Sequence, residues 1–224
     1  MATQPQLFET LRDRVVNGEF APGCRLKPEV LRLDYGVSAS TLREILFRLS
    51  TVGLVEFQEQ RGFRIPPQSP KLQHDLTQFR ILMECEGACL SIRNGGLPWE
   101  ARLTAAHHKL SFIESRVQDG QSSPEVLTLW TTAELDFHRT LIDSCGSDVL
   151  KQSHAVVYHR FRQQMIISDR EFTFAPQNIR QHQRILDAAL DHDEAMIRTR
   201  ITEHLSRNLM HELSNPAQSD SGAA

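Results

Sequence analysis

Two potential metal ligands, Glu134 and His138, lie four residues apart in a stretch with the apolar spacing of a helix. Residues at this separation share one helix face, so the carboxylate and the imidazole can converge on a single ion. Asp136, between them, points to nearly the opposite face. The chain contains ten histidines, and any one of them can be a surface or hydrogen-bonded residue. The spacing therefore identifies a pair of candidate ligands, not a complete site.

A second group of polar side chains, Ser38, Ser40, Thr41 and Arg43, lies at the start of another expected helix. Hydroxyls and exposed backbone N–H groups at a helix N-terminus can hold phosphates, helped by the positive end of the helix dipole. Arg43 lies off the apolar stripe of this helix and can reach a phosphate or the acceptor edge of guanine. Each residue also has a simpler role available, because Ser38 or Ser40 can be a helix cap and Arg43 a solvated charge.

The elements that would position the second group form a recognisable pattern in residues 1–66. One predicted helix ends at Gly36 and the next ends before Gly53, in each case at a residue type that favours helix termination. Two strand-like stretches follow, at residues 54–57 and 63–65. Two helices joined by a tight glycine-containing turn and followed by a hairpin predict a winged helix-turn-helix, which lays its recognition helix in the major groove of DNA.

A proline-rich segment at residues 67–70 is expected to be a linker. Residues 71–213 then show only long amphipathic periods, whose breaks delimit about six helices. Residues 214–224 are rich in Ser, Asp, Gly and Ala and are expected to form a flexible tail. The predicted fold class is therefore mainly α, with an N-terminal winged helix-turn-helix and a C-terminal all-helical bundle.

Composition narrows the classes of function. Hydrophobic residues make up 40% and charged residues 24% of the chain, as in a folded globular protein. We expect a cytoplasmic protein without a membrane partner, since there is no signal-peptide pattern and no apolar run of about 18 residues. Residues 1–66 carry nine Lys/Arg against eight Asp/Glu, and the remainder sixteen against twenty. Any DNA contact thus belongs in the first third. The four cysteines form no CxxC pair, which indicates reduced thiols.

Residues 7–66 resemble the GntR family of bacterial regulators. In that family an arginine that commonly reads a base follows the serine of the recognition helix, and Ala39 replaces it here. Base readout would then fall more on Arg43, Ser40 and Thr41, and the resemblance implies that Arg61 and Gly62 at the wing tip approach the minor groove or backbone. The resemblance rests on the strings Pro22-Gly23-x-Arg25-Leu26, Tyr35-Gly36-Val37-Ser38, Leu42-Arg43-Glu44-x-Leu46-x-Arg48-Leu49, Gly53-Leu54-Val55 and Gln60-Arg61-Gly62-Phe63-Arg64-Ile65.

Residues 71–213 resemble the all-helical FCD effector domain of one GntR subfamily. The strings are Arg80-Ile81-Leu82-Met83-Glu84, Phe137-His138-Arg139-x-Leu141 and Gly146, and Gly95-Gly96-x-x-Trp99-Glu100-Ala101 is similar to the carbon-starvation-type regulators.

In the FCD family an Asp and three His bind a divalent metal. The resemblance assigns His138, His182 and His204 to the histidines and Glu134 to the position of the aspartate. Glutamate is one methylene longer but is still an oxygen donor. Three imidazoles and one carboxylate suit zinc first, then nickel or manganese, and leave positions open for an effector carboxylate.

Together these features lead us to expect a homodimeric transcription regulator that binds a double-stranded DNA operator and a small carboxylate effector. We expect it to repress a nearby catabolic operon and to have no catalytic residues. Arg80, Arg160 and Arg162 are candidates to bind the effector, because arginine pairs bidentately with carboxylates, although each can equally be a surface residue.

Two alternatives remain open. A metal-dependent enzyme built on a helical bundle would leave the winged motif unexplained, and the sequence has no HExxH or comparable motif. A protein-binding winged helix that has lost its DNA affinity gains weight from Ala39.

Overall fold

The computed structural model describes residues 4–119, 123–169 and 175–210, so the expected tail at 214–224 lies outside the described residues. The chain divides into two compact units. The first comprises residues 1–69 and 159–167, and the second comprises residues 70–158 and 168–224. Among the described helices, none combines the length and apolarity that crossing a membrane requires.

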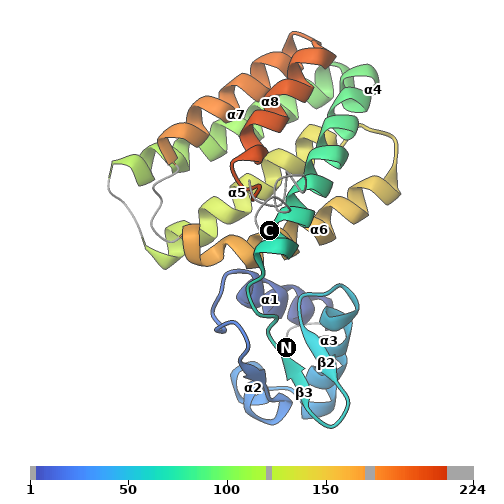
Figure 1. Cartoon of the computed structure of the whole chain (residues 1–224), viewed down its shortest axis with the longest axis vertical. Coiled ribbons are helices and arrows are strands. Elements are labelled where there is room, and N and C mark those ends of the chain that lie inside the picture. Colours follow the sequence, from blue (N-terminus) through green and yellow to red (C-terminus); the bar gives the residue numbers. More distant parts are fainter. Residues whose placement is uncertain (1–3, 120–122, 170–174, 211–224) are drawn as a thin grey trace, which may run out of the picture. The chain divides into compact units, whose positions relative to one another are not determined.

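The first unit contains the predicted winged helix-turn-helix (Figure 1). Its strands form a small antiparallel sheet in the order β1-β3-β2, in which a short strand that the sequence did not reveal lies beside the predicted hairpin. The elements are α1 (Gln4–Val16), β1 (Arg25–Leu26), α2 (Pro28–Tyr35), α3 (Ala39–Thr51), β2 (Glu56–Gln58) and β3 (Gly62–Arg64).

Helix α3 begins and packs as its sequence predicts. Ser38 is the N-cap, with its hydroxyl accepting a hydrogen bond from the Thr41 backbone N–H at 3.1 Å, and such a cap stabilises a helix by about 1 kcal/mol. Gly36 ends α2 in the left-handed conformation, with φ 62°, which glycine adopts without steric cost. The predicted stripe is fully buried in the core of this unit and fixes which face of α3 is exposed. It consists of Leu42, Ile45, Leu46 and Leu49.

The wing is the hairpin of β2 and β3, in which Phe57 pairs with Phe63. Its turn requires positive φ at Gln60 (63°) and Gly62 (77°). The Arg25 side chain donates from Nε and Nη2 to the Arg61 carbonyl oxygen, at 3.0 and 2.7 Å. Arg25 therefore links the wing tip to β1 by two hydrogen bonds.

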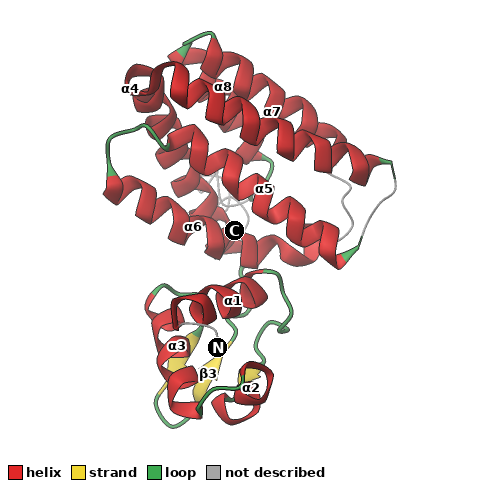
Figure 2. Ribbon diagram, turned by 180° about the vertical axis from the view of Figure 1, so that it is seen from behind, coloured by secondary structure: helices red, strands yellow, loops and turns green. Residues whose placement is uncertain are grey.

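The second unit is helical, as expected for the all-helical bundle. Helix α4 packs against α5, α7 and α8, and α7 lies beside α8 (Figures 1 and 2). Helix α4 is kinked, because Gly96 has non-helical angles (φ 54°, ψ −167°) inside it. The helices are α4 (Pro70–Gln118), α5 (Pro124–Ile142), α6 (Asp148–Asp169), of which residues 159–167 belong to the first unit, α7 (Ala175–Leu190) and α8 (Glu194–Ser206).

Close approach of α4 to α5 depends on Gly87. A Cβ atom at this position would come within 2.7 Å of Ile142 Cγ2, too close for any larger residue without a shift of the branched side chain. Glu84 precedes Gly87 by about one turn and His138 precedes Ile142 by about one turn. The glycine therefore lets these two polar side chains meet between the helices.

Candidate metal centre and nucleic-acid interface

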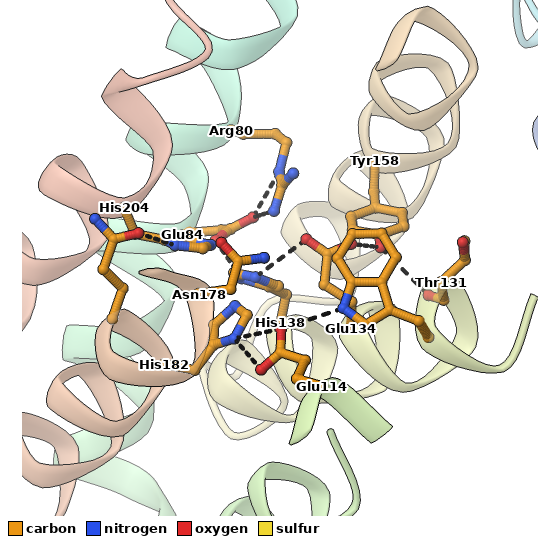
Figure 3. A network of polar contacts seen from close by, with 12 residues as sticks. Arg80, Glu84, Glu114, Thr131, Glu134, His138, Tyr158, Asn178, His182 and His204 are labelled. Carbon is orange, nitrogen blue, oxygen red and sulfur yellow. Dashed lines mark hydrogen bonds and ion pairs between the residues drawn. The ribbon is translucent and has the colours of Figure 1, made fainter. Parts of the chain in front are cut away.

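Three histidines from three helices converge inside the second unit (Figure 3). His138 comes from α5, His182 from α7 and His204 from α8, and each side chain is buried. One ring nitrogen from each lies within 4.8 Å of the others. The ring centroids are 5.6 Å apart for His138 and His182, and 4.5 Å apart for His182 and His204. We call these residues the histidine triad.

Each histidine of the triad has its Nδ1 within hydrogen-bonding distance of a side-chain oxygen. A hydrogen bond donated from Nδ1 places the lone pair of a neutral imidazole on Nε2, as in histidines that bind a metal through Nε2. The Nε2 atoms of His138 and His182 are buried, and the described residues offer them no hydrogen-bond partner. The Nδ1 pairs are His138 with Glu84 Oε2 (2.8 Å), His182 with Glu114 Oε1 (3.3 Å) and His204 with Gln181 Oε1 (3.2 Å).

Two histidines of the triad, His138 and His204, have lowered pKa values. Burial lowers the pKa of His138, although Glu84 partly opposes this shift. Burial, with His182 and Arg207, lowers the pKa of His204 well below its ordinary value. These two imidazoles are thus neutral at neutral pH, and a neutral imidazole can donate its lone pair to a cation. Buried Nε2 atoms without a hydrogen-bond partner among the described residues, on His138 and His182, fit a divalent metal of the zinc type.

Glu134 lies beside the triad. Its Oε1 is 3.6 Å from His138 Nε2, and its other oxygen accepts a short hydrogen bond from the Tyr158 hydroxyl (Figure 3). The side chain is buried. The carboxylate is therefore close enough to His138 to bind the same ion. Its role as a metal ligand stays a prediction.

Sequence reasoning missed a buried carboxylate, Glu84, at the centre of the polar network. It accepts hydrogen bonds from Arg80 Nε at 2.9 Å, lies 2.8 Å from His138 Nδ1 and lies 2.9 Å from His154 Nε2. Burial raises the pKa of Glu84, but Arg80 and His138 more than offset it, and the pKa lies well below its ordinary value. Glu84 is thus a buried anion that orients a candidate ligand. The available signals were its spacing of four from Arg80 and its place in the string from Arg80 to Glu84 that resembles the FCD domain.

Glu114 is the second buried carboxylate that the sequence did not single out. It accepts a hydrogen bond from Trp130 Nε1 at 3.1 Å and lies 3.3 Å from His182 Nδ1. Glu114 and His182 are far apart in the chain, so no local spacing indicated the pair.

The three arginines predicted to bind the effector occupy different units. Arg80 is fully buried in the helical unit, with its guanidinium carbon 4.9 Å from the centre of the Tyr158 ring. Arg160 and Arg162 belong to the first unit. There Arg162 is buried, and a Cβ at Gly53 would lie 2.9 Å from Arg160 Nε. Arg80 is the candidate that contacts the network around the triad.

The predicted DNA-contacting residues gather at α3 and the wing. Ser38, Ser40 and Arg43 are exposed, as is Arg61 at the wing tip, whereas Thr41 and Gly62 are half-buried. A hollow of about 410 Å³ is lined by residues of several elements, among them Arg43 of α3 and Arg61 at the wing tip. We call it the cationic hollow, because its lining has four cations, Arg25, Lys27, Arg43 and Arg61, and two carboxylates, Glu29 and Glu59.

Comparison with known families accounts for both units. The family described as bacterial regulatory proteins, gntR family, matches residues 3–65, and the FCD domain matches residues 75–207. The chain belongs to the GntR family and carries an FCD domain. It is therefore a transcriptional regulator of the GntR/FCD type.

Named relatives of this GntR protein are transcription regulators. It is 32% identical to the uncharacterized HTH-type transcriptional regulator BphR of Paraburkholderia xenovorans (strain LB400), over 90% of this chain and 82% of the relative. It is 27% identical to the HTH-type transcriptional repressor GlaR of Escherichia coli (strain K12), over 88% and 90%.

Solved structures share the fold. E. coli McbR/YncC is similar with a TM-score of 0.75 and 18% identity, over 93% of this chain and 96% of that one. A putative GntR transcriptional regulator from Rhodococcus sp. RHA1 is similar with a TM-score of 0.74 and 22% identity, over 91% and 94%. The GntR/FCD architecture predicted from the sequence is thus confirmed.

Proposed function

We propose that this GntR regulator is a homodimeric repressor of a catabolic operon, with a divalent metal centre in its FCD domain that takes a small carboxylate effector. The observation that carries the metal part is the set of three buried histidines, each with Nδ1 directed at a side-chain oxygen, two of which have a buried Nε2 without a hydrogen-bond partner in the described part of the chain. Repression is supported by the name of GlaR, a relative that is a repressor.

The chain's own residues have defined tasks in this centre. The triad and Glu134 would hold the ion, zinc before nickel or manganese, while Glu84 and Glu114 orient two of the rings. A bound divalent metal supplies a Lewis acid that attracts a carboxylate. Arg80, buried beside the network, adds positive charge that favours an anionic effector.

Effector binding would act on DNA binding through the dimer. A two-fold dimer reads a pseudo-palindromic operator with fixed half-site spacing. An effector that favours a different placement of the two DNA-binding units by about 1–3 kcal/mol is sufficient to weaken operator binding 5- to 150-fold.

Gel shifts with the DNA upstream of the protein's own gene test the proposal. We expect zinc-loaded protein to shift this fragment in the presence of excess unrelated DNA, and we expect a small carboxylate to release it. Absence of any sequence-selective shift with the zinc-loaded dimer would contradict operator binding. A selective shift that no member of a carboxylate panel reverses would contradict the effector.

Replacing Arg43 by alanine is expected to weaken operator binding about 5- to 150-fold, the effect of losing a contact to guanine. Fluorescence anisotropy with a labelled operator measures this change. Arg102→Ala is the matched control, because it also removes an exposed arginine, one that pairs with Asp143 in the helical unit. Equal affinities of the Arg43 and Arg102 variants would favour a protein-binding winged helix.

A further inference from the structure

The exposed face of α3 carries a large apolar residue among its polar ones. Ser40, Arg43, Glu44 and Phe47 are all exposed and follow the spacing of one helix face. The Phe47 side chain is 51% exposed, while the opposite face of α3 supplies the core. Phe47 is therefore not needed to pack the unit, and it lies one turn beyond Arg43 on the predicted DNA-reading face.

A second aromatic residue, Phe57 on β2, supports Phe47. The two rings meet edge to face with centroids 5.9 Å apart and planes at 76°. Phe57 is 44% exposed and lies 4.9 Å from the ring of its strand partner Phe63, which is buried. The core thus anchors Phe57, and Phe57 limits the positions that Phe47 can take.

These rings border a second hollow that shares lining residues with the cationic hollow. A volume of about 350 Å³ is lined by Ser40, Arg43, Glu44, Phe47, Phe57 and Phe63. Arg43, Phe57 and Phe63 also line the cationic hollow. We call the exposed rings of Phe47 and Phe57 the apolar patch. This patch is therefore part of the surface that carries the predicted DNA contacts.

The chemistry of the patch fits one feature of the major groove. Base edges in this groove offer hydrogen-bond donors and acceptors, and their apolar group is the C5 methyl of thymine, which alanine and phenylalanine side chains contact. Ala39, at the start of α3, is half-buried and adds a methyl group near the same surface. Hydrogen bonding to bases gives no role to an exposed phenylalanine that packs against a second aromatic ring on this face of α3.

We propose that Phe47, positioned by Phe57, contacts thymine C5 methyl groups in the operator's major groove. This readout rests on the proposed function, since it requires α3 to lie in the groove. It predicts thymine at one or more positions of each half-site, next to the bases or phosphates that Arg43 contacts.

The test replaces single thymines of the footprinted operator by deoxyuridine, which removes the methyl group and keeps the base-pairing groups. We expect wild-type protein to bind about fourfold more weakly when the contacted thymine is replaced, the effect of burying one methyl group. Phe47→Ala should bind the thymine and deoxyuridine operators equally. Phe47→Leu, which stays apolar, should retain part of the difference. Phe112→Ala, which removes another exposed phenylalanine, from α4, should behave like wild type.

Three outcomes overturn the methyl readout. One is a wild-type protein insensitive to every deoxyuridine while Arg43→Ala still weakens binding, which leaves operator binding by α3 standing. If Arg43→Ala also has no effect, both proposals fail. The third is a Phe47→Ala protein that keeps the wild-type deoxyuridine penalty but dissociates into monomers in sedimentation, which would make the patch an interface between copies.

Discussion

Replacing Glu84 by alanine is expected to lower the free energy of unfolding of the helical unit by about 3–5 kcal/mol, the usual effect of breaking a buried ion pair. The substitution would leave the buried Arg80 guanidinium without its carboxylate at 2.8 Å. It would also remove the partner of His138 Nδ1 and of His154 Nε2. A buried charge that has lost this carboxylate and two buried imidazole nitrogens that have lost this partner all favour the unfolded chain.

Tryptophan fluorescence during urea unfolding measures this loss in metal-free protein. The two tryptophans of the chain, Trp99 and Trp130, are both buried in the helical unit, so the signal reports on that unit. Asp143→Ala is the control, because it breaks an ion pair with Arg102 in which both side chains are about half exposed. It should lose less than about 1 kcal/mol. Equal losses in the two variants would show that the Glu84 network does not stabilise the unit.

The Glu84 network links two features that the sequence presented separately. The predicted effector arginine, Arg80, and the predicted metal ligand, His138, contact different oxygens of the Glu84 carboxylate. An anion drawn toward Arg80 would compete with Glu84, and any shift of Glu84 changes the support of His138. Through this carboxylate, effector binding and metal binding are expected to affect each other, as reciprocal linkage requires.

Local chemistry made the DNA-binding unit predictable. The Ser38 cap, the left-handed Gly36 and the buried stripe of α3 each follow from residue type and spacing within one or two turns. Strand β1 was missed because two residues, Arg25 and Leu26, give no periodic signal and pair with β3, far along the chain. Propensity and periodicity depend on residues that are close in sequence, so they do not predict pairing between strands far apart in the chain.

The candidate metal centre, in contrast, could not be predicted from local sequence patterns alone. The spacing of Glu134 and His138 indicated a shared helix face, but His182 and His204 joined them only through resemblance to the FCD family. Their convergence depends on how α5, α7 and α8 pack, which no local pattern encodes. Glu114 was missed for the same reason, since its partner His182 lies on another helix.

Adding zinc to metal-free protein is expected to stabilise the helical unit by about 4 kcal/mol when free zinc exceeds its dissociation constant a thousandfold. The physical reason is that the folded chain presents one buried nitrogen from each of three imidazoles within 4.8 Å of the others, whereas the unfolded chain disperses them. Urea unfolding with and without zinc, followed by tryptophan fluorescence, measures the increase. His182→Ala should abolish most of the stabilisation by zinc, because only two of the three imidazoles of the triad would remain.

His108→Ala is the matched control for this prediction. His108 is exposed on α4, so its loss changes the histidine content without changing the triad, and the zinc effect should equal that of wild type. Glu84→Gln should bind zinc more weakly, by 10- to 100-fold, because a neutral amide supports His138 less well than a carboxylate does. Equal zinc stabilisation of the wild-type, His182→Ala and His108→Ala proteins would show that the triad is not the metal site. Stabilisation lost in His182→Ala but unaffected by Glu84→Gln would retain the site and remove the role of Glu84 in orienting His138.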